Sequence, residues 1–312
     1  MTAFAFVFPG QGSQAVGMLD AWGDHPAVAQ TLAEASAALG EDIGRLIHEG
    51  PKEELALTTN TQPVMLTAGI ACWRAWRAEG GAEPIAVAGH SLGEYTALVA
   101  AGALALADAL PLVRLRATAM QEAVPVGAGA MAAILGLDAQ AVRTTCAAAA
   151  AESGEVVEAV NFNDPKQTVI AGTKAGVDKA CEMLKAAGAK RALPLPVSAP
   201  FHSSLMKPAA LRLQAALAEV AIAAPRIPVV NNIDVASPTD AAAIRDALVR
   251  QAAGPVRWVE VVQALKARGA THVIECGPGK VLAGMAKRID DSLVAASVYD
   301  PASLAEVKGL LA

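Results

Sequence analysis

Cysteine and excess basic charge are both scarce in this sequence. Four cysteines are scattered along the chain with no C-x-x-C pair, at Cys72, Cys146, Cys181 and Cys276. We therefore expect free thiols and a cytoplasmic location rather than a disulfide framework. The 25 Lys and Arg residues are outnumbered by 30 Asp and Glu residues, which gives a net charge of -5. Nucleic-acid binders usually carry a basic patch or stripe, so nucleic acid is not an expected partner.

Long apolar runs are also missing, although hydrophobic residues make up 54% of the chain. Much of that share is alanine, which favours helices and does not indicate a membrane protein. Uncharged stretches such as 123–137 are interrupted by Pro and Gly. They are shorter than the roughly 20 apolar residues of a spanning helix. No Lys or Arg precedes the first apolar stretch, so we expect neither a signal peptide nor a membrane partner.

Short apolar segments alternate with alanine-rich helical segments over most of the chain. Strands are predicted at 4–8, 85–88, 228–231, 271–276 and 293–298. Helices are predicted at 64–78, 241–251 and 258–267, and a long helix is predicted directly after Ser91. This alternation indicates an α/β fold with a mostly parallel sheet that helices cover on both faces.

The middle of the chain follows a different order. Its predicted elements are strand, helix, strand, strand, helix and strand, at 131–137, 138–151, 156–162, 168–171, 174–187 and 191–196. A tight turn is expected at Asn163-Asp164-Pro165. This order is typical of a ferredoxin-like domain. We therefore predict an inserted small domain at 125–197, within a large domain formed by 1–124 and 198–312.

The segment Gly89-His90-Ser91-Leu92-Gly93 fits G-x-S-x-G, with a predicted strand before it and a helix after it. Glycines flank a turn too sharp for side chains, which exposes the serine hydroxyl at the end of the strand. The following helix directs its positive end at the site, so the Leu92 N–H can face an oxyanion. Ser91 is therefore the candidate nucleophile of an acyl transfer reaction.

A serine nucleophile needs a base, and His202 is the favoured histidine. It lies in an irregular segment, Ser198-Ala199-Pro200-Phe201-His202-Ser203-Ser204, before a helix, where catalytic residues often lie. His25 and His48 are next to charged residues and are expected to be solvated. His272 begins a strand, which favours a structural role. His90 is adjacent to Ser91 and is expected to point away from it and pack.

Two glycine-rich segments partly match nucleotide-binding motifs, but the rest of each motif is missing. The run from Gly10 to Ala15 follows a strand, but Glu34 lies in a helical run instead of after a second strand, where a ribose-binding acid belongs. The segment 277–281 lacks both the first glycine and the Ser or Thr of a P-loop.

Several motifs taken together resemble the malonyl-CoA:acyl carrier protein transacylase family. The resemblance runs nearly end to end, and its motifs occur in the same order. They are Phe8-Pro9-Gly10-Gln11-Gly12-Ser13-Gln14, Gly89-His90-Ser91-Leu92-Gly93-Glu94-Tyr95, Gln121-Glu122-Ala123-Val124-Pro125, Asn161-Phe162-Asn163, Pro200-Phe201-His202-Ser203-Ser204-Leu205-Met206 and Glu275-Cys276-Gly277-Pro278-Gly279.

The resemblance implies roles for six residues. Ser91 would attack a thioester, with His202 as base and then acid. The N–H groups of Gln11 and Leu92 would form the oxyanion hole. Arg116 would pair with the malonyl carboxylate, while Arg114 faces elsewhere on the same helix. The backbone carbonyl of Gln251 would orient the imidazole, so the family uses no triad carboxylate.

The family also implies a fold, partners and cofactor use. The expected fold is an α/β-hydrolase-like large domain with the ferredoxin-like insert packed over the serine. Malonyl-CoA would donate the acyl group and acyl carrier protein would accept it, for fatty acid biosynthesis. We expect no metal and no cofactor beyond the coenzyme A thioester itself, and we expect a monomer.

Three further functions stay open at this point. An α/β-hydrolase esterase would need an Asp or Glu side chain to orient His202. A non-catalytic scaffold subunit of a synthase would not need Ser91, His202 and Arg116 intact. The related subunit of malonate decarboxylase would load malonate on a different carrier.

Overall fold

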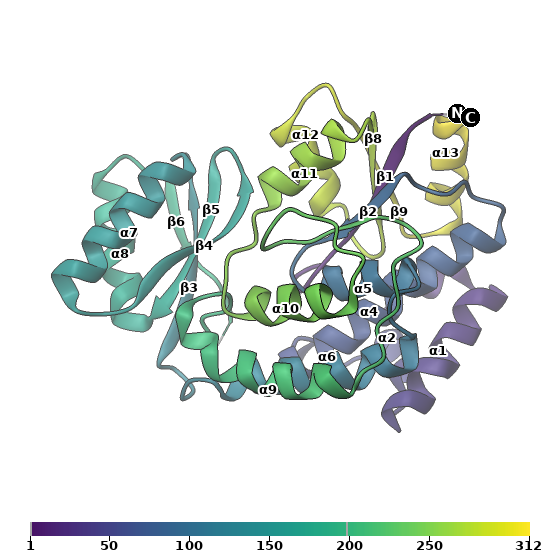
Figure 1. Cartoon of the computed structure of the whole chain (residues 1–312), viewed down its shortest axis with the longest axis horizontal. Coiled ribbons are helices and arrows are strands. Elements are labelled where there is room, and N and C mark those ends of the chain that lie inside the picture. Colours follow the sequence, from purple (N-terminus) through teal and green to yellow (C-terminus); the bar gives the residue numbers. More distant parts are fainter. Residues whose placement is uncertain (1, 198) are drawn as a thin grey trace.

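Two β-sheets with helices packed around them form this protein, whose computed structural model describes residues 2–197 and 199–312 (Figure 1). The larger sheet has the order β7-β2-β1-β8-β9, and every neighbouring pair in it is parallel. Its strands are β1 (Phe4–Phe8), β2 (Ala86–Gly89), β7 (Val229–Val230), β8 (His272–Cys276) and β9 (Val294–Val298). The sequence predicted each of these strands to within two residues.

Alternating residues of β1 face two different hydrophobic cores, because successive side chains of a strand point to opposite faces. Phe4, Phe6 and Phe8 pack in one core with helices α4 (Thr58–Ala78), α5 (Gly93–Ala100) and α6 (Leu106–Glu122). Ala5 and Val7 pack in the other with α11 (Trp258–Ala267) and α12 (Val281–Ile289). Helices therefore cover both faces of the parallel sheet, as the uninterrupted apolar strand predicted.

The second sheet is antiparallel and has the order β4-β5-β3-β6. Two helices cover it, and together they form the teal lobe at the left of Figure 1. Along the chain the elements are β3 (Gly129–Leu135), α7 (Ala139–Ser153), β4 (Val157–Asp164), β5 (Gln167–Thr173), α8 (Lys174–Ala186) and β6 (Arg191–Pro194). This is the predicted strand, helix, strand, strand, helix, strand order. The predicted turn is displaced, because β4 continues to Asp164 and the chain reverses at Pro165 and Lys166.

The prediction of one long helix after Ser91 is wrong. The chain forms the short helix α5, reverses, and starts α6 at Leu106. Gly102 has a φ of +74° in this connection, a left-handed conformation that ends α5 and that glycine adopts without a steric penalty. Alanine-rich composition hid the break, since helix propensity is high on both sides of it. As a result, Arg116 lies on the second helix after the serine.

The other helices lie around the larger sheet (Figure 1). Among residues 2–197 and 199–312, no helix combines the length and apolar character needed to cross a membrane. The helices not yet named are α1 (Pro26–Leu39), α2 (Ile43–Glu49), α3 (Lys52–Leu55), α9 (Lys207–Glu219), α10 (Ala241–Ala252), α13 (Pro301–Leu311) and the short 3-10 helices η1 (Asp20–Trp22) and η2 (Ser204–Met206).

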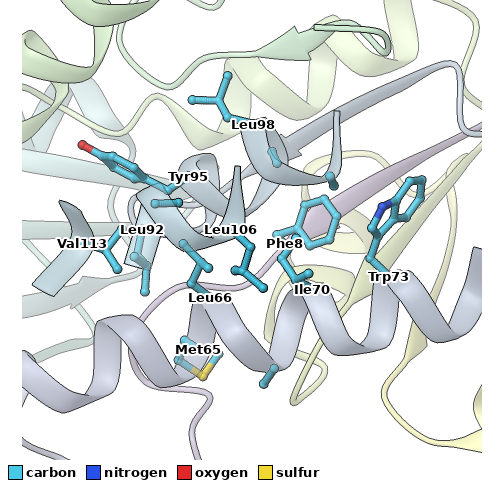
Figure 2. Close-up of a cluster of buried hydrophobic side chains, with 14 of the residues drawn as sticks. Phe8, Met65, Leu66, Ile70, Trp73, Leu92, Tyr95, Leu98, Leu106 and Val113 are labelled. Carbon is cyan, nitrogen blue, oxygen red and sulfur yellow. The ribbon is translucent and has the colours of Figure 1, made fainter. Parts of the chain in front are cut away.

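The turn at 89–93, called the elbow below, is held against β1 by an unusually close backbone approach. A Cβ atom on Gly93 would lie 2.1 Å from the Phe8 carbonyl oxygen, and one on Gly89 would lie 1.9 Å from the Gly93 carbonyl. Only glycine fits at these two positions. Below the elbow, the Leu92 side chain packs in the core beside Leu66 of α4 and Val113 of α6 (Figure 2).

Replacing Gly93 with alanine should therefore destabilise the fold, even though alanine is the better helix former by about 1 kcal/mol. The added methyl group meets backbone that has little room to move, and such overpacking typically costs about 1–3 kcal/mol. We expect Gly93→Ala to lower the melting temperature measured by circular dichroism. Gly309→Ala in α13 is the matched control, since its Cβ would meet nothing within 4 Å and should leave the melting temperature unchanged or raised. Equal melting temperatures of the two variants would contradict the steric argument.

Candidate active site

Ser91 occupies a strained backbone position at the carboxyl end of β2. Its φ of +53° is in the left-handed region, which residues other than glycine rarely adopt. Such strain persists only where neighbouring groups hold it. Here the Ser91 N–H donates to Asn232 Oδ1 at 2.7 Å, and the Asn232 side-chain amide donates to the Gly89 carbonyl at 2.7 Å. Asn232 therefore clamps the elbow from the end of β7, the neighbouring strand.

His202 is the histidine that contacts the serine. Its Nε2 lies 2.7 Å from Ser91 Oγ, and its Nδ1 lies 2.9 Å from the backbone oxygen of Gln251. A carbonyl oxygen only accepts, so Nδ1 carries the proton and Nε2 presents its lone pair to the serine hydroxyl. Burial, and to a lesser degree the charge of Arg116, lowers the pKa of His202 to about 3. The imidazole is therefore neutral at physiological pH and free to accept a proton.

Arg116 brings a positive charge to the same hydroxyl. The guanidinium donates to Ser91 Oγ at 3.2 Å, to Gln62 Oε1 at 2.8 Å and to Gln251 Oε1 at 3.1 Å. It also lies 5.4 Å from the Tyr95 ring centroid. Burial lowers the pKa of Arg116, whose side chain is only 2% exposed. All three acceptors are neutral, and Nε has no hydrogen-bond partner among the described residues, so the charge remains available to an anion.

Gln11 and Leu92 complete the surroundings of the serine. Gln11 follows β1, and its side chain donates to Thr58 at 3.3 Å. Leu92 lies at the N-terminal end of α5. Across residues 2–197 and 199–312, no backbone acceptor is paired with the N–H of Gln11 or Leu92. Two N–H groups without a backbone acceptor, one of them at the N-terminal end of α5, can stabilise a developing negative charge.

These groups open onto a cavity of about 130 Å³ that has both polar and apolar walls. Its polar lining includes Gln11, Gln62, Ser91, Arg116 and His202. A second cavity of about 310 Å³ shares Gln11, His90, Asn161 and Leu195 with it and reaches between the two sheets. The structure therefore brings together all six residues that the family resemblance implied, since Gln251 contacts both His202 and Arg116.

The remaining histidines and Arg114 lie away from the reacting atoms. His90 turns from the serine to Asn163 Oδ1 at 2.8 Å and packs near Trp258. The Arg114 guanidinium donates two hydrogen bonds to the Glu41 carboxylate. His48 is exposed as expected and pairs with Asp20. The expectation that His25 is solvated is wrong, because its ring caps α1 by accepting from the Ala27 N–H and is only 15% exposed.

Sequence reasoning missed three residues of the site: Gln62, Glu94 and Asn232. Gln62 lies in the first half of α4, where only the contact with Arg116 distinguishes it. Asn232 follows a short parallel strand, and carboxyl ends of parallel strands meet at one edge of a sheet, which was an available signal. Glu94 is a charged residue within an otherwise apolar helix, and its burial to 1% exposure is the informative feature.

Residues 5–308 match the family model described as the acyl transferase domain. The chain is 56% identical over 305 residues to malonyl CoA-acyl carrier protein transacylase of Salmonella typhimurium, an alignment that covers 97% of this chain and 98% of the relative. A crystal structure of acyl-carrier-protein S-malonyltransferase from Burkholderia pseudomallei is 70% identical, with a TM-score of 0.97 over 99% of this chain and 100% of that chain. A malonyl-transacylase solved with a type II PKS acyl-carrier protein is 51% identical, with a TM-score of 0.97 over 99% and 100% of the chains.

The neutral state of His202 has a consequence for stability. Below the ordinary histidine pKa of 6.5 the unfolded chain protonates this residue, whereas the folded protein does not until about pH 3. Stability from this group is therefore lost as pH falls. Between pH 7.5 and 5.0, wild type should lose about 2 kcal/mol more unfolding free energy than His202→Asn, which cannot be protonated.

Urea unfolding of both proteins at the two pH values checks this difference. Asparagine retains an N–H donor for the Gln251 carbonyl, so the comparison isolates the titration. Parallel losses in the two proteins would show that His202 is protonated in the folded state.

Proposed function

This chain belongs to the acyl transferase domain family, and on that premise we propose that it transfers the malonyl group from malonyl-CoA to the phosphopantetheine thiol of acyl carrier protein. The observation that carries this proposal is the position of Ser91 Oγ, which contacts both the His202 imidazole and the Arg116 guanidinium. One hydroxyl thus has a base on one side and a carboxylate-binding cation on the other. That combination suits an acyl donor with a free carboxylate, as required in fatty acid biosynthesis.

The first half-reaction forms an ester on Ser91. His202 Nε2 takes the hydroxyl proton while Ser91 Oγ attacks the thioester carbonyl. The N–H groups of Gln11 and Leu92 stabilise the oxyanion. When the tetrahedral intermediate collapses, the carbon–sulfur bond breaks and the coenzyme A thiolate takes the proton from His202. The 2.7 Å contact between His202 Nε2 and Ser91 Oγ, together with the lowered pKa of the imidazole, supports this role for the base.

The second half-reaction reverses these steps with a different thiol. His202 deprotonates the phosphopantetheine thiol of the carrier, whose sulfur attacks the malonyl ester. Collapse releases Ser91 Oγ, which recovers the proton. Donor and acceptor carry the same pantetheine arm, so one channel serves both. The cavity of about 310 Å³ that adjoins the serine pocket supports this proposal.

Arg116 would recognise the malonyl carboxylate. A guanidinium binds a carboxylate through two parallel hydrogen bonds and keeps its charge when water is excluded. Gln62 and Gln251 hold the group from two directions, so it is already placed when the substrate arrives. Preorganisation of this kind lowers the cost of ordering the site on binding.

The imidazole partner favours transfer over ester hydrolysis by an α/β-hydrolase. Such an esterase would orient its histidine with an Asp or Glu side chain. Here the Nδ1 proton meets the Gln251 backbone carbonyl. A scaffold subunit would differ from the proposed enzyme in having no activity, and the malonate decarboxylase subunit would differ in its acceptor. Acyl transfer activity would exclude the scaffold subunit, and the identity of the native carrier separates the other two functions.

We also propose that no metal or redox cofactor takes part, since acyl exchange between thioesters changes no oxidation state. Every reacting group comes from one chain, which is consistent with a functional monomer. Four free cysteines suit a cytoplasmic location.

The domain division follows the two sheets. We propose an inserted domain at 125–197 and a large domain formed by 1–124 and 198–312, of which Met1 and Ser198 lie outside the described residues. All strands of the antiparallel sheet lie between Gly129 and Pro194, and this segment has its own core. Its strand order supports a ferredoxin-like insert, and the parallel sheet with its strand–Ser91–helix turn supports an α/β-hydrolase-like large domain.

Brief exposure to malonyl-CoA should leave a malonyl ester on the peptide that contains Ser91. Mass spectrometry of a rapid acid quench measures it, and the Ser91→Ala protein should carry no label. A label found on one of the cysteines, or no label on wild type, would refute the mechanism.

Removal of Arg116 should change which acyl group is accepted. In Arg116→Ala a malonyl carboxylate would be buried unpaired, which costs several kcal/mol and should lower malonyl transfer by ~100-fold or more. Acetyl transfer should be kept or raised. Transfer rates with the two acyl-CoA donors check this, and Arg114→Ala is the matched control with wild-type selectivity, because Arg114 pairs with Glu41 away from the pocket. An equal fall for both acyl groups would make Arg116 a structural residue.

A further inference from the structure

Glu94 is a buried carboxylate that the mechanism above does not use. It lies in the first turn of α5, three residues after Ser91, with 1% of its surface exposed. One of its oxygens, Oε2, accepts from the Asn232 N–H at 2.8 Å and from Gln251 Nε2 at 3.0 Å. Buried carboxylates are rare because desolvation is costly, so the contacts of this one indicate what it does.

The contact with Gln251 places the side-chain amide of that residue between two ionisable groups. Its Nε2 donates to Glu94, while its Oε1 accepts from the Arg116 guanidinium at 3.1 Å. The reverse orientation would direct the amide NH₂ at the guanidinium and the amide oxygen at the carboxylate, and both pairs would repel. The charges on the two sides therefore permit one orientation only. Arg116 is held beside Ser91 Oγ in that orientation.

The contact with Asn232 connects the same carboxylate oxygen to the elbow. Asn232, whose N–H donates to Glu94, accepts from the Ser91 N–H and donates to the Gly89 carbonyl. Gln251 Nε2 also donates to the Ser91 carbonyl at 3.0 Å. Hydrogen bonds thus link Glu94 to the backbone of Ser91, through Asn232 and Gln251. They also link it to the side chain of Arg116, through Gln251.

From this geometry we propose that Glu94 is a positioning residue for acyl selectivity, which acts through the Gln251 amide to hold Arg116 where it meets a substrate carboxylate. The inference rests on the proposed function, since it assumes that Arg116 recognises malonate. Glu94 does not touch the substrate. The Gln251 amide lies between Glu94 and Arg116. Glu94 therefore helps to hold the guanidinium in place but does not pair with it directly, so the guanidinium can still bind a substrate carboxylate.

The hydrogen bonds around Glu94 fit this role. Burial raises the pKa of its carboxyl group to about 7, while the hydrogen bonds from Gln251 and Asn232 and the charge of Arg116 lower it. Asp234 raises it. Both neighbours of Oε2 are N–H donors, which is the pattern that a carboxylate oxygen requires.

The test compares Glu94→Met with Glu94→Gln. Methionine has the same length but no acceptor, so Gln251 Nε2 loses one of its two acceptors and the amide is held less firmly. Malonyl transfer should then fall by about tenfold or more relative to acetyl transfer, because a misplacement of about 1 Å can cost 100-fold. Glutamine can present its amide oxygen to both N–H donors, so its malonyl-to-acetyl ratio should stay within about threefold of wild type. The ratio of kcat/KM values for malonyl-CoA and acetyl-CoA is the readout.

A double-mutant cycle tests the route through Gln251. Gln251→Ala removes the amide but leaves the backbone carbonyl that holds His202. The selectivity loss of Glu94→Met should not add to that of Gln251→Ala, because both break the same connection. If Glu94→Met does not fold, as judged by circular dichroism, Glu94→Asp replaces it, since the shorter side chain withdraws the carboxylate and should shift selectivity in the same direction.

Three outcomes would overturn the inference in a folded variant: equal losses of malonyl and acetyl transfer, additive effects with Gln251→Ala, or a glutamine variant as unselective as the methionine variant. Wild type that forms no malonyl ester on Ser91 would instead refute the proposed function. The selectivity ratio therefore tests the role of Glu94, whereas labelling of Ser91 tests the proposed function.

Discussion

The contact between the backbone of β1 and the elbow is the constraint on which the site depends. Gly93 lies so close to the Phe8 carbonyl that no side chain fits between them, and Gly89 is equally close to Gly93. This approach turns the chain sharply enough to put Ser91 at a φ of +53°. Its hydroxyl is thereby directed into the pocket, and the N-terminus of α5 lies directly behind it. The packing of Leu92 under the turn resists any relaxation of this geometry (Figure 2).

Around this serine, no carboxylate of the described residues pairs directly with Arg116. The imidazole is oriented by a neutral carbonyl, and the guanidinium is held by neutral amide oxygens and the serine hydroxyl. Under the proposed function, a carboxylate in either place would compete with the substrate for Arg116 and repel a malonyl group. The buried carboxylate that is present, Glu94, lies one amide further away. The arrangement leaves a positive charge without an anionic partner in a buried position, where electrostatic interactions are strong.

The inserted sheet contributes to the pocket without supplying a reacting group. Met131 of β3 and Asn161 of β4 line the serine cavity, and Ala133 and Val169 line the adjoining one. The groups proposed to react lie outside this sheet: Ser91 follows β2, His202 lies in the turn before η2, and Arg116 lies within α6. The antiparallel sheet therefore contributes to the walls of the site and not to the proposed chemistry.

Local patterns in the sequence determined a large part of this protein. Apolar runs predicted the strands because a strand buried on both faces must be apolar, and the order of elements in the middle segment predicted the second sheet. The G-x-S-x-G motif identified Ser91 because a sharp turn restricts residue types locally. His202 was selected by elimination among five histidines, and the roles of Gln11, Arg116 and Gln251 came from family resemblance alone.

Only the tertiary structure decided the rest, because the relevant contacts join residues far apart in the chain. The break between α5 and α6 depends on one left-handed glycine within a helix-favouring stretch, which propensity does not reveal. Asn232 and Gln251 meet Ser91 across 141 and 160 residues, and no local pattern encodes such a pair. Burial is also a tertiary property. It keeps the His202 imidazole neutral, leaves the Arg116 charge without a direct anionic partner among the described residues, and makes Glu94 a buried acceptor for both Gln251 and Asn232.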